Sequence, residues 1–297
     1  MKPSNKKLNT PRVSIGMPVY NGEKYIRDAL DSLINQTFTD FELIISDNAS
    51  TDNTEKLCRE YMSIENRISY FRQEKNIGAI ANFDFVLRHA KSSYFMWAAY
   101  DDEWDKEYLK SALLLLEDES IDFVFPTFMV KSIRLGFYKN FKKEIFSFVE
   151  SMDRRLRVLK LIALHHDSHK CNIVYSLFRT EFLRKAFKKQ DIGNDGALGA
   201  VITCMGRGKL LDSTLFKKRY SLLWPGLLSP IFRIFRRQSE EFNLAKKNAL
   251  NRMEKLFPEY AAEIRLIFDA YNPYSYSKGY QIADFDNLID FKNTVKD

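Results

Sequence analysis

The chain has 297 residues, of which 45% are hydrophobic and 14% aromatic, so it can bury a substantial core and is not a mainly disordered protein. Its 11 glycines and 8 prolines are too few for a fibrous or low-complexity protein. The formal net charge of +7 is uneven, because residues 131–237 hold 23 basic and 8 acidic residues and the rest holds 23 basic and 31 acidic ones.

Short apolar runs alternate with amphipathic segments up to residue 126. The runs predict strands at 13–18, 41–46, 68–71, 94–98 and 122–125, and the amphipathic segments predict helices at 23–36, 51–62, 79–89 and 105–117. Strands and helices in this alternation predict an α/β fold with a doubly wound, mostly parallel sheet flanked by helices.

The alternation weakens after residue 126. We expect helices at 154–164 and 195–205, a strand at 172–178, and short strands at 210–211 and 214–216. Beyond residue 224 the pattern is helical. The basic and apolar segment 224–237 could contact a membrane surface or pack on the rest of the protein.

The three cysteines are far apart and do not form a disulfide framework, which indicates a reducing compartment. The polar N-terminus lacks the apolar stretch of a secretory signal, and no apolar run reaches the ~18 residues of a membrane span. We therefore expect a cytoplasmic protein, with contact to the inner face of the cytoplasmic membrane left open.

Polar residues follow three of the predicted strands: Tyr20 and Asn21, Asp47 and Asn48, and Asp101 and Asp102. Ligands of open parallel sheets bind beyond the carboxyl ends of the strands. We therefore expect these residues to converge on one crevice.

Each motif has two interpretations. Asp101 and Asp102 could bind a divalent cation or cap the next helix. Asp47 could accept a hydrogen bond from a base or ribose, or form an Asx turn before a helix capped by Ser50 or Asp52. Tyr20 could stack on a base or be an ordinary core or surface tyrosine.

Together these motifs resemble those of family 2 glycosyltransferases, which have the GT-A fold. The matching runs are VSIGMPVYNGE, SDNASTD, KNIGAIANF and YDDEW. The resemblance is strong over residues 11–126 and weaker to about residue 220. It implies a GT-A domain at 1–220, with a donor half at 11–126 and an acceptor half at 127–220. A helical extension would occupy 221–297.

The resemblance implies roles for the motif residues. Pro18, Tyr20 and Asn21 would lie beside the nucleotide base, and Asp47 would accept the N3–H of uracil. The segment with Asn76, Gly78 and Asn82 would line the ribose and diphosphate. Asp102 would contact Mn²⁺ or Mg²⁺, and Asp101 the ribose or donor sugar as part of the same metal motif.

The general base of inverting members matches Asp195, with Asp191 as the alternative, and Glu103 and Trp104 would face the acceptor. The sequence departs from the family in having Ala99 and Tyr100 before the acidic pair, so the first aspartate of the longer metal motif is missing. Because of this departure, the sequence does not decide whether the donor nucleotide is UDP, dTDP or GDP.

The implied function is metal-dependent, inverting transfer of a sugar from a nucleotide sugar, with a UDP-sugar as the first expectation, to a hydroxyl of a glycan or lipid-linked glycan. The alternatives are an inactive relative that binds nucleotide sugars and a basic nucleic-acid-binding protein. We expect no nucleic acid partner, because the sequence has no recognised module for one. The basic region would then face an anionic acceptor or an anionic surface that carries it.

Overall fold

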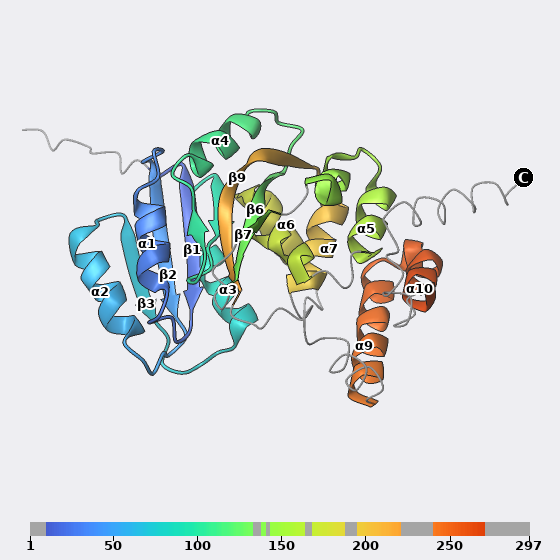
Figure 1. Cartoon of the computed structure of the whole chain (residues 1–297), viewed down its shortest axis with the longest axis horizontal. Coiled ribbons are helices and arrows are strands. Elements are labelled where there is room, and N and C mark those ends of the chain that lie inside the picture. Colours follow the sequence, from blue (N-terminus) through green and yellow to red (C-terminus); the bar gives the residue numbers. More distant parts are fainter. Residues whose placement is uncertain are drawn as a thin grey trace, which may run out of the picture.

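The computed structural model describes residues 10–132, 138–140, 143–163, 168–187, 195–220 and 240–270. In these segments nine strands form one sheet, in the order β3-β2-β1-β4-β8-β6-β9-β5 with β7 paired to β6 (Figure 1). Helices flank the sheet, and this confirms the predicted α/β class.

The N-terminal half supplies the parallel part of the sheet. Its strands are β1 (Val13–Val19), β2 (Phe41–Asp47), β3 (Ile68–Arg72) and β4 (Tyr94–Trp97). The helices between and after them are α1 (Ile26–Ile34), α2 (Thr54–Ile64), α3 (Ala79–His89) and α4 (Tyr108–Leu115). All seven residues of β1 are buried, as expected of a central strand covered on both faces.

Close packing of α3 on β1 depends on Gly16. A Cβ atom at this position would come within 2.7 Å of side-chain atoms of Phe95 and Val86. The absence of a side chain therefore allows Val86 of α3 to approach the sheet closely.

The second half is antiparallel or mixed. It contains β5 (Glu103–Trp104), β6 (Phe123–Ser132), β7 (Tyr138–Asn140), β8 (Leu177–Arg179) and β9 (Gly208–Tyr220). β9 runs parallel to β6 and antiparallel to β5, with shifts in register beside Thr127. The two short strands expected at 210–211 and 214–216 are therefore parts of one long strand.

The strand predicted at 172–178 is wrong over most of its length. The 3₁₀ helix η2 (Ser168–Tyr175) occupies this part, and only β8 is extended. Ile173 and Val174 are buried, and a short buried apolar run has no periodicity that separates a strand from a helical turn.

Helices cover the rest of the described chain. They are η1 (Lys143–Glu150), α5 (Arg154–Ala163), α6 (Thr180–Phe187), α7 (Asp195–Met205), α9 (Glu240–Leu256), η3 (Pro258–Tyr260) and α10 (Ala261–Ala270). Figure 1 shows α9 and α10 at the opposite end of the molecule from α2, beside α5. Ion pairs join Arg154 to Glu259 at 2.9 Å and Arg155 to Glu263 at 3.3 Å, so α5 is fastened to η3 and α10.

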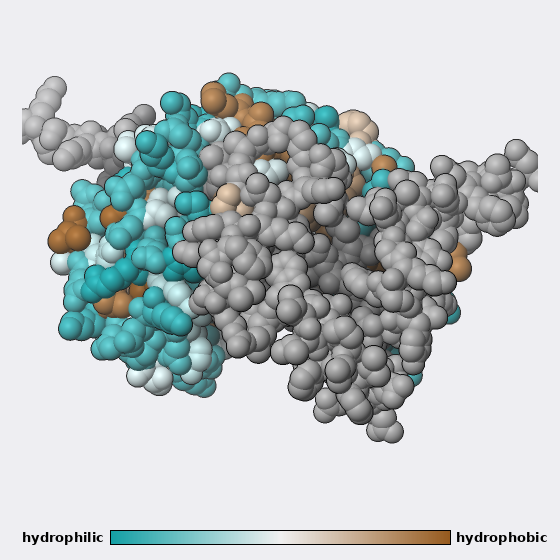
Figure 2. Space-filling view, in the orientation of Figure 1, coloured by the Kyte–Doolittle hydropathy of each residue, from teal (hydrophilic) through white to brown (hydrophobic). Residues whose placement is uncertain are grey.

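The described surface of the N-terminal half is mostly hydrophilic in Figure 2, with separate small apolar areas. No helix within the described segments combines the length and apolar character that crossing a membrane requires. The segment 224–237, which could contact a membrane surface, lies outside the described residues.

Candidate active site

Hydrogen bonds join the loops after β1 and β2 at the carboxyl edge of the sheet. The Asn21 N–H donates to Ser50 Oγ at 2.9 Å, and the Thr51 N–H donates to Asn21 Oδ1 at 2.8 Å. Asn21 and Ala49 both have left-handed backbones, with φ of 52° and 62°. Asparagine adopts this conformation readily, but it strains an alanine, and such strain concentrates at functional sites.

Tyr20 stands out from this edge. Its side chain is 42% exposed, so the ring is available for stacking, whereas Pro18 is buried in β1 opposite Ser46. The Pro18–Asn21 turn therefore lies at the carboxyl edge of the sheet and carries an exposed tyrosine.

Asn76 organises the turn before α3. Its Oδ1 accepts the Asn48 Nδ2–H at 3.0 Å and the Gly78 N–H at 2.9 Å. The Ile77 N–H donates to Asn48 Oδ1 at 2.8 Å. Gly78 has a φ of 85° and no side-chain cap follows it, so the first N–H groups of α3 are open at this edge.

Asp47 is completely buried at the end of β2. One oxygen accepts the Ser50 N–H at 2.8 Å, and the other accepts the Tyr70 hydroxyl at 2.6 Å and the Arg72 guanidinium at 2.8 Å. The predicted base-recognition residue is therefore part of an internal network. Its bond to the Ser50 N–H reaches three residues ahead, one more than the expected Asx turn requires.

Asn82 is also occupied inside the protein. It is 2% exposed. Its Oδ1 accepts the Ser46 hydroxyl at 2.6 Å, and its Nδ2 donates to the Ser46 carbonyl at 2.9 Å. These two bonds fasten α3 to β2, so the Asn82 amide is directed at the sheet.

The two aspartates of the acidic motif have different surroundings. Asp101 is half-buried, and its carboxylate accepts no hydrogen bond from the residues that the structure describes. Asp102 is completely buried, accepting the Lys218 ammonium at 3.2 Å and the Arg219 N–H at 2.9 Å. These contacts with β9 occupy the aspartate that we expected to contact the metal.

Burial dominates the electrostatics of this pair. It raises the pKa of Asp102 to about 6, although Lys218 and the Arg219 N–H favour the carboxylate. Burial opposes the charge on Lys218, but the attraction of Asp102 and its neighbours outweighs it and raises the pKa of the ammonium. The two groups lie 3.2 Å apart as an ion pair.

Glu103 and Trp104, expected on the acceptor side, make internal contacts. Glu103 and Asp28 both bind the guanidinium of Arg219. Trp104 is 3% exposed and stacks on Phe216, with ring centroids 4.2 Å apart. In this conformation the two side chains join β5 to β9 and α1.

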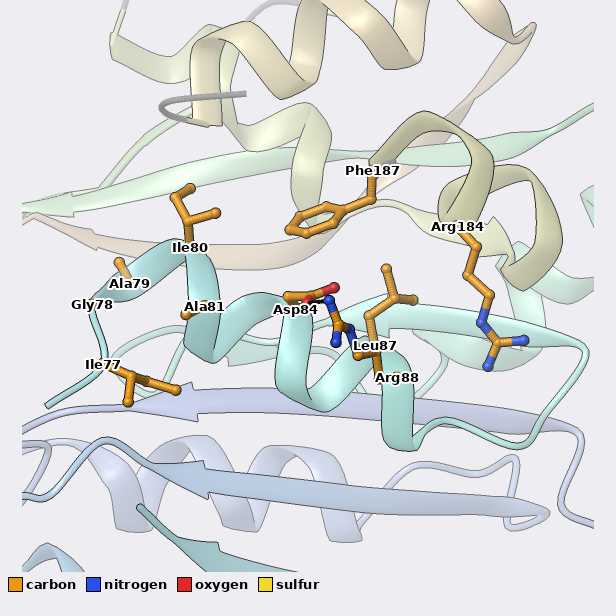
Figure 3. A pocket seen from close by; sticks show the side chains of 10 residues that line it. All are labelled: Ile77, Gly78, Ala79, Ile80, Ala81, Asp84, Leu87, Arg88, Arg184 and Phe187. Carbon is orange, nitrogen blue, oxygen red and sulfur yellow. Dashed lines mark ion pairs between the residues drawn. The ribbon is translucent and has the colours of Figure 1, made fainter. Parts of the chain in front are cut away.

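A groove of about 830 Å³ runs between α3 and the end of α6, beside Gly78 (Figure 3). Ile80 of α3 and Phe187 of α6 project into the space between the helices, with Asp84 and Leu87 farther along (Figure 3). The guanidiniums of Arg88 and Arg184 line it as well. The groove therefore joins the start of α3 to the end of α6.

The predicted base Asp195 is the first residue of α7, and nothing is described of its side chain. Asp191 lies outside the described residues. The other end of α7 is fixed by the buried Arg157, which donates to the Thr203 carbonyl at 2.7 Å. A firmly held helix thus carries Asp195 at its start.

Four residues that contact the predicted site were not identified from the sequence. Tyr70 and Arg72 bind Asp47, and Lys218 and Arg219 bind Asp102 or its neighbour. The sequence signal for the second pair was slight. It consists of three consecutive basic residues at the end of an expected short strand.

The acidic motif can hold a divalent cation through Asp101. Among the described residues no three His, Cys, Asp or Glu side chains gather as a metal site. However, Mg²⁺ often binds through one or two carboxylates together with substrate phosphates. A half-buried carboxylate at the strand edge fits that mode of binding, whereas the paired Asp102 does not.

A family model described as Glycosyl transferase family 2 matches residues 14–187. TuaG of Bacillus subtilis, a glycosyltransferase provisionally named for teichuronic acid biosynthesis, is 34% identical over 115 residues, which are 39% of this chain and 46% of TuaG. The chain thus spans less than half of this relative.

Two solved structures resemble the whole fold. TarS 1–349 of S. aureus in complex with UDP-GlcNAc has a TM-score of 0.60 at 17% identity, covering 94% of this chain and 79% of that one. The mannosyltransferase PcManGT of Pyrobaculum calidifontis, in complex with GDP-Man and Mn²⁺, has a TM-score of 0.51 at 17% identity, covering 97% and 81%. These likenesses confirm the GT-A fold.

Proposed function

The chain belongs to glycosyl transferase family 2, and from this premise we propose that it transfers a sugar from a nucleotide sugar to an acceptor hydroxyl. The donor is a UDP-sugar, the reaction inverts the anomeric centre, and the acceptor is a glycan or lipid-linked glycan. The UDP-GlcNAc complex of TarS supports this choice of nucleotide as an analogy.

The observation that carries the proposal is the arrangement of the strand edge. Tyr20 is exposed after β1, the uncapped start of α3 follows β3, and Asp101 is half-buried after β4. Together they offer an aromatic face for a base, N–H groups for a diphosphate and a carboxylate for a cation. A nucleotide sugar requires each of these contacts.

We assign the two aspartates differently from the sequence expectation. Asp101 is the carboxylate that would hold Mn²⁺ or Mg²⁺, because the Asp102 carboxylate is paired with Lys218. When bound, such an ion would offset the negative charge that develops on the leaving diphosphate. The Mn²⁺ in the PcManGT complex supports a divalent cation in this fold.

Asp195 acts as the general base. It takes the proton of the acceptor hydroxyl as that oxygen attacks the anomeric carbon from the face opposite the diphosphate, and the bond to the diphosphate oxygen breaks. A well-placed base contributes ~10²–10⁴-fold to the rate. The acceptor approaches along the groove between α3 and α6.

A nucleotide-sugar panel tests the proposal. Thermal unfolding is followed with UDP-, GDP- and dTDP-sugars, each with and without Mn²⁺, and release of the nucleotide is then measured. Ligand at 100 times its Kd stabilises a fold by about 2.7 kcal/mol, which raises Tm by roughly 5–11 °C in a protein of this size. Binding without nucleotide release would indicate an inactive relative, and no shift with any nucleotide would refute the proposal.

We also propose a cytoplasmic location, with contact to the membrane through residues 224–237. A vesicle flotation assay with the full chain, with the arginines of this segment changed to glutamine in a control, tests the contact.

A further inference from the structure

Asp102 and Lys218 form a buried ion pair between segments that are 116 residues apart in sequence. The Asp102 side chain has no exposed surface, and that of Lys218 is 17% exposed. The Lys218 ammonium also lies 4.8 Å from the ring centroid of Tyr175 and 6.0 Å from that of Phe216. The cation therefore has an acidic partner and two aromatic neighbours.

The next residue along β9 strengthens the attachment. The Arg219 N–H donates to Asp102 at 2.9 Å, and the Arg219 guanidinium binds Asp28 of α1 and Glu103 of β5. Two consecutive residues of β9 thus hold Asp102 and Glu103. This arrangement fixes the backbone next to Asp101.

We propose that Lys218 is a positioning residue that keeps Asp102 away from the metal and makes it the anchor of the acidic motif. The inference rests on the proposed function. It leaves Asp101 as the one carboxylate of the motif that is open to a cation, because Ala99 replaces the first aspartate of the longer motif.

A consequence for binding follows from this division. One carboxylate binds a hard divalent cation weakly, and the remaining oxygen ligands have to come from water or from substrate phosphates. Metal and nucleotide therefore bind with strong positive coupling, and each raises the affinity of the other by the same factor. We expect UDP to tighten Mn²⁺ binding by at least tenfold.

Three variants of the full chain distinguish Asp102 as the anchor from Asp101 as the metal ligand. For each, Mn²⁺ binding is measured by electron paramagnetic resonance with and without UDP. Asp101→Asn removes the tightening by UDP and leaves Tm within about 2 °C of the wild type. Asp102→Asn leaves Lys218 buried without its partner and lowers Tm by roughly 10 °C. The double variant Asp102→Asn with Lys218→Met replaces the pair by neutral groups, recovers the lost Tm and keeps the tightening within threefold.

A labelling experiment on the wild type does not depend on the folding of any variant. Acetylation of lysines by acetic anhydride is measured by mass spectrometry, with the more exposed Lys209 as the internal reference. Lys218 should react slowly, and Mn²⁺ with UDP should leave its rate unchanged or lower. If Asp102 became a metal ligand, Lys218 would be released and its rate would rise.

The outcomes are distinct. Loss of the UDP effect in the double variant, or faster labelling of Lys218 with Mn²⁺ and UDP, would overturn the anchoring role while leaving the proposed function intact. Failure of the wild type to bind Mn²⁺ and UDP at all would overturn both. Retention of the UDP effect in Asp101→Asn would also refute the division between the two aspartates.

Discussion

The substitution Asp47→Asn tests whether the buried carboxylate at the end of β2 holds the fold together. Asparagine has the same shape and keeps one oxygen for the Ser50 N–H. Its NH₂ group, however, replaces the oxygen that accepts the Tyr70 hydroxyl and the Arg72 guanidinium. The tyrosine hydroxyl can rotate and accept a bond, but the guanidinium has only donors.

The expected loss follows from the Arg72 contact. A hydrogen bond to a charged group contributes about 1.5–3 kcal/mol. Arg72 keeps 34% of its side-chain surface exposed and can rehydrate, so we expect about 2 kcal/mol in the free energy of unfolding. In a protein of this size that lowers Tm by roughly 4–8 °C.

Urea and thermal unfolding, followed by circular dichroism, measure the change. Arg72→Met should cost somewhat more, because it leaves the buried Asp47 charge without its cation. The double variant should lose less than the sum of the two single changes. Glu60→Gln, which breaks the exposed pair with Arg27, is the matched control and should change stability by less than about 0.5 kcal/mol.

One result would refute this reasoning. If Asp47→Asn kept Tm within 1 °C of the wild type but weakened UDP binding tenfold or more, the carboxylate would be free to recognise the base. The internal network around Asp47 would then not represent its state in the donor complex.

Three further changes test the site and core. Asn82→Ala should lower stability by about 2–3 kcal/mol in urea unfolding, because it removes two buried bonds to Ser46; unchanged stability with weaker donor binding would assign the amide to the donor. Ala49→Gly should raise stability by about 0.5–1 kcal/mol, because glycine relieves the left-handed backbone but loses more entropy on folding; a lower Tm contradicts it. Burial raises the Cys58 pKa to about 12 from 9.0, so this thiol favours folding below pH 9 and that contribution falls as pH rises toward 12. Wild-type stability should therefore fall faster than that of Cys58→Ala between pH 9 and 11, and equal slopes would contradict it.

The parallel half of the fold was predictable because most of its strands are buried, β1 entirely and β2 and β4 at all but one residue each. Such strands appear as nearly continuous apolar runs. The limits of β1 to β4, including the largely exposed β3, fall within about one residue of the predicted ones. The polar residues after these strands were found for the same reason, since parallel strands direct their carboxyl ends to one edge.

The antiparallel half was harder to predict because its pairing is long-range. β9 carries polar residues in its middle, and these divided one strand into two expected pieces. The partners of Asp102 come from a strand whose register cannot be inferred from a single sequence. Sequence pattern identified the acidic motif, but only the sheet topology showed which aspartate is buried.

The uneven charge of the chain also has a structural explanation. Several described arginines of the basic region have partners within the protein: Arg157 and Arg179 donate to backbone carbonyls, and the partly exposed Arg154 and Arg155 bind acids of the C-terminal helices. Buried or paired cations project little field into solvent. The net charge of residues 131–237 is therefore not a measure of an anion-binding surface.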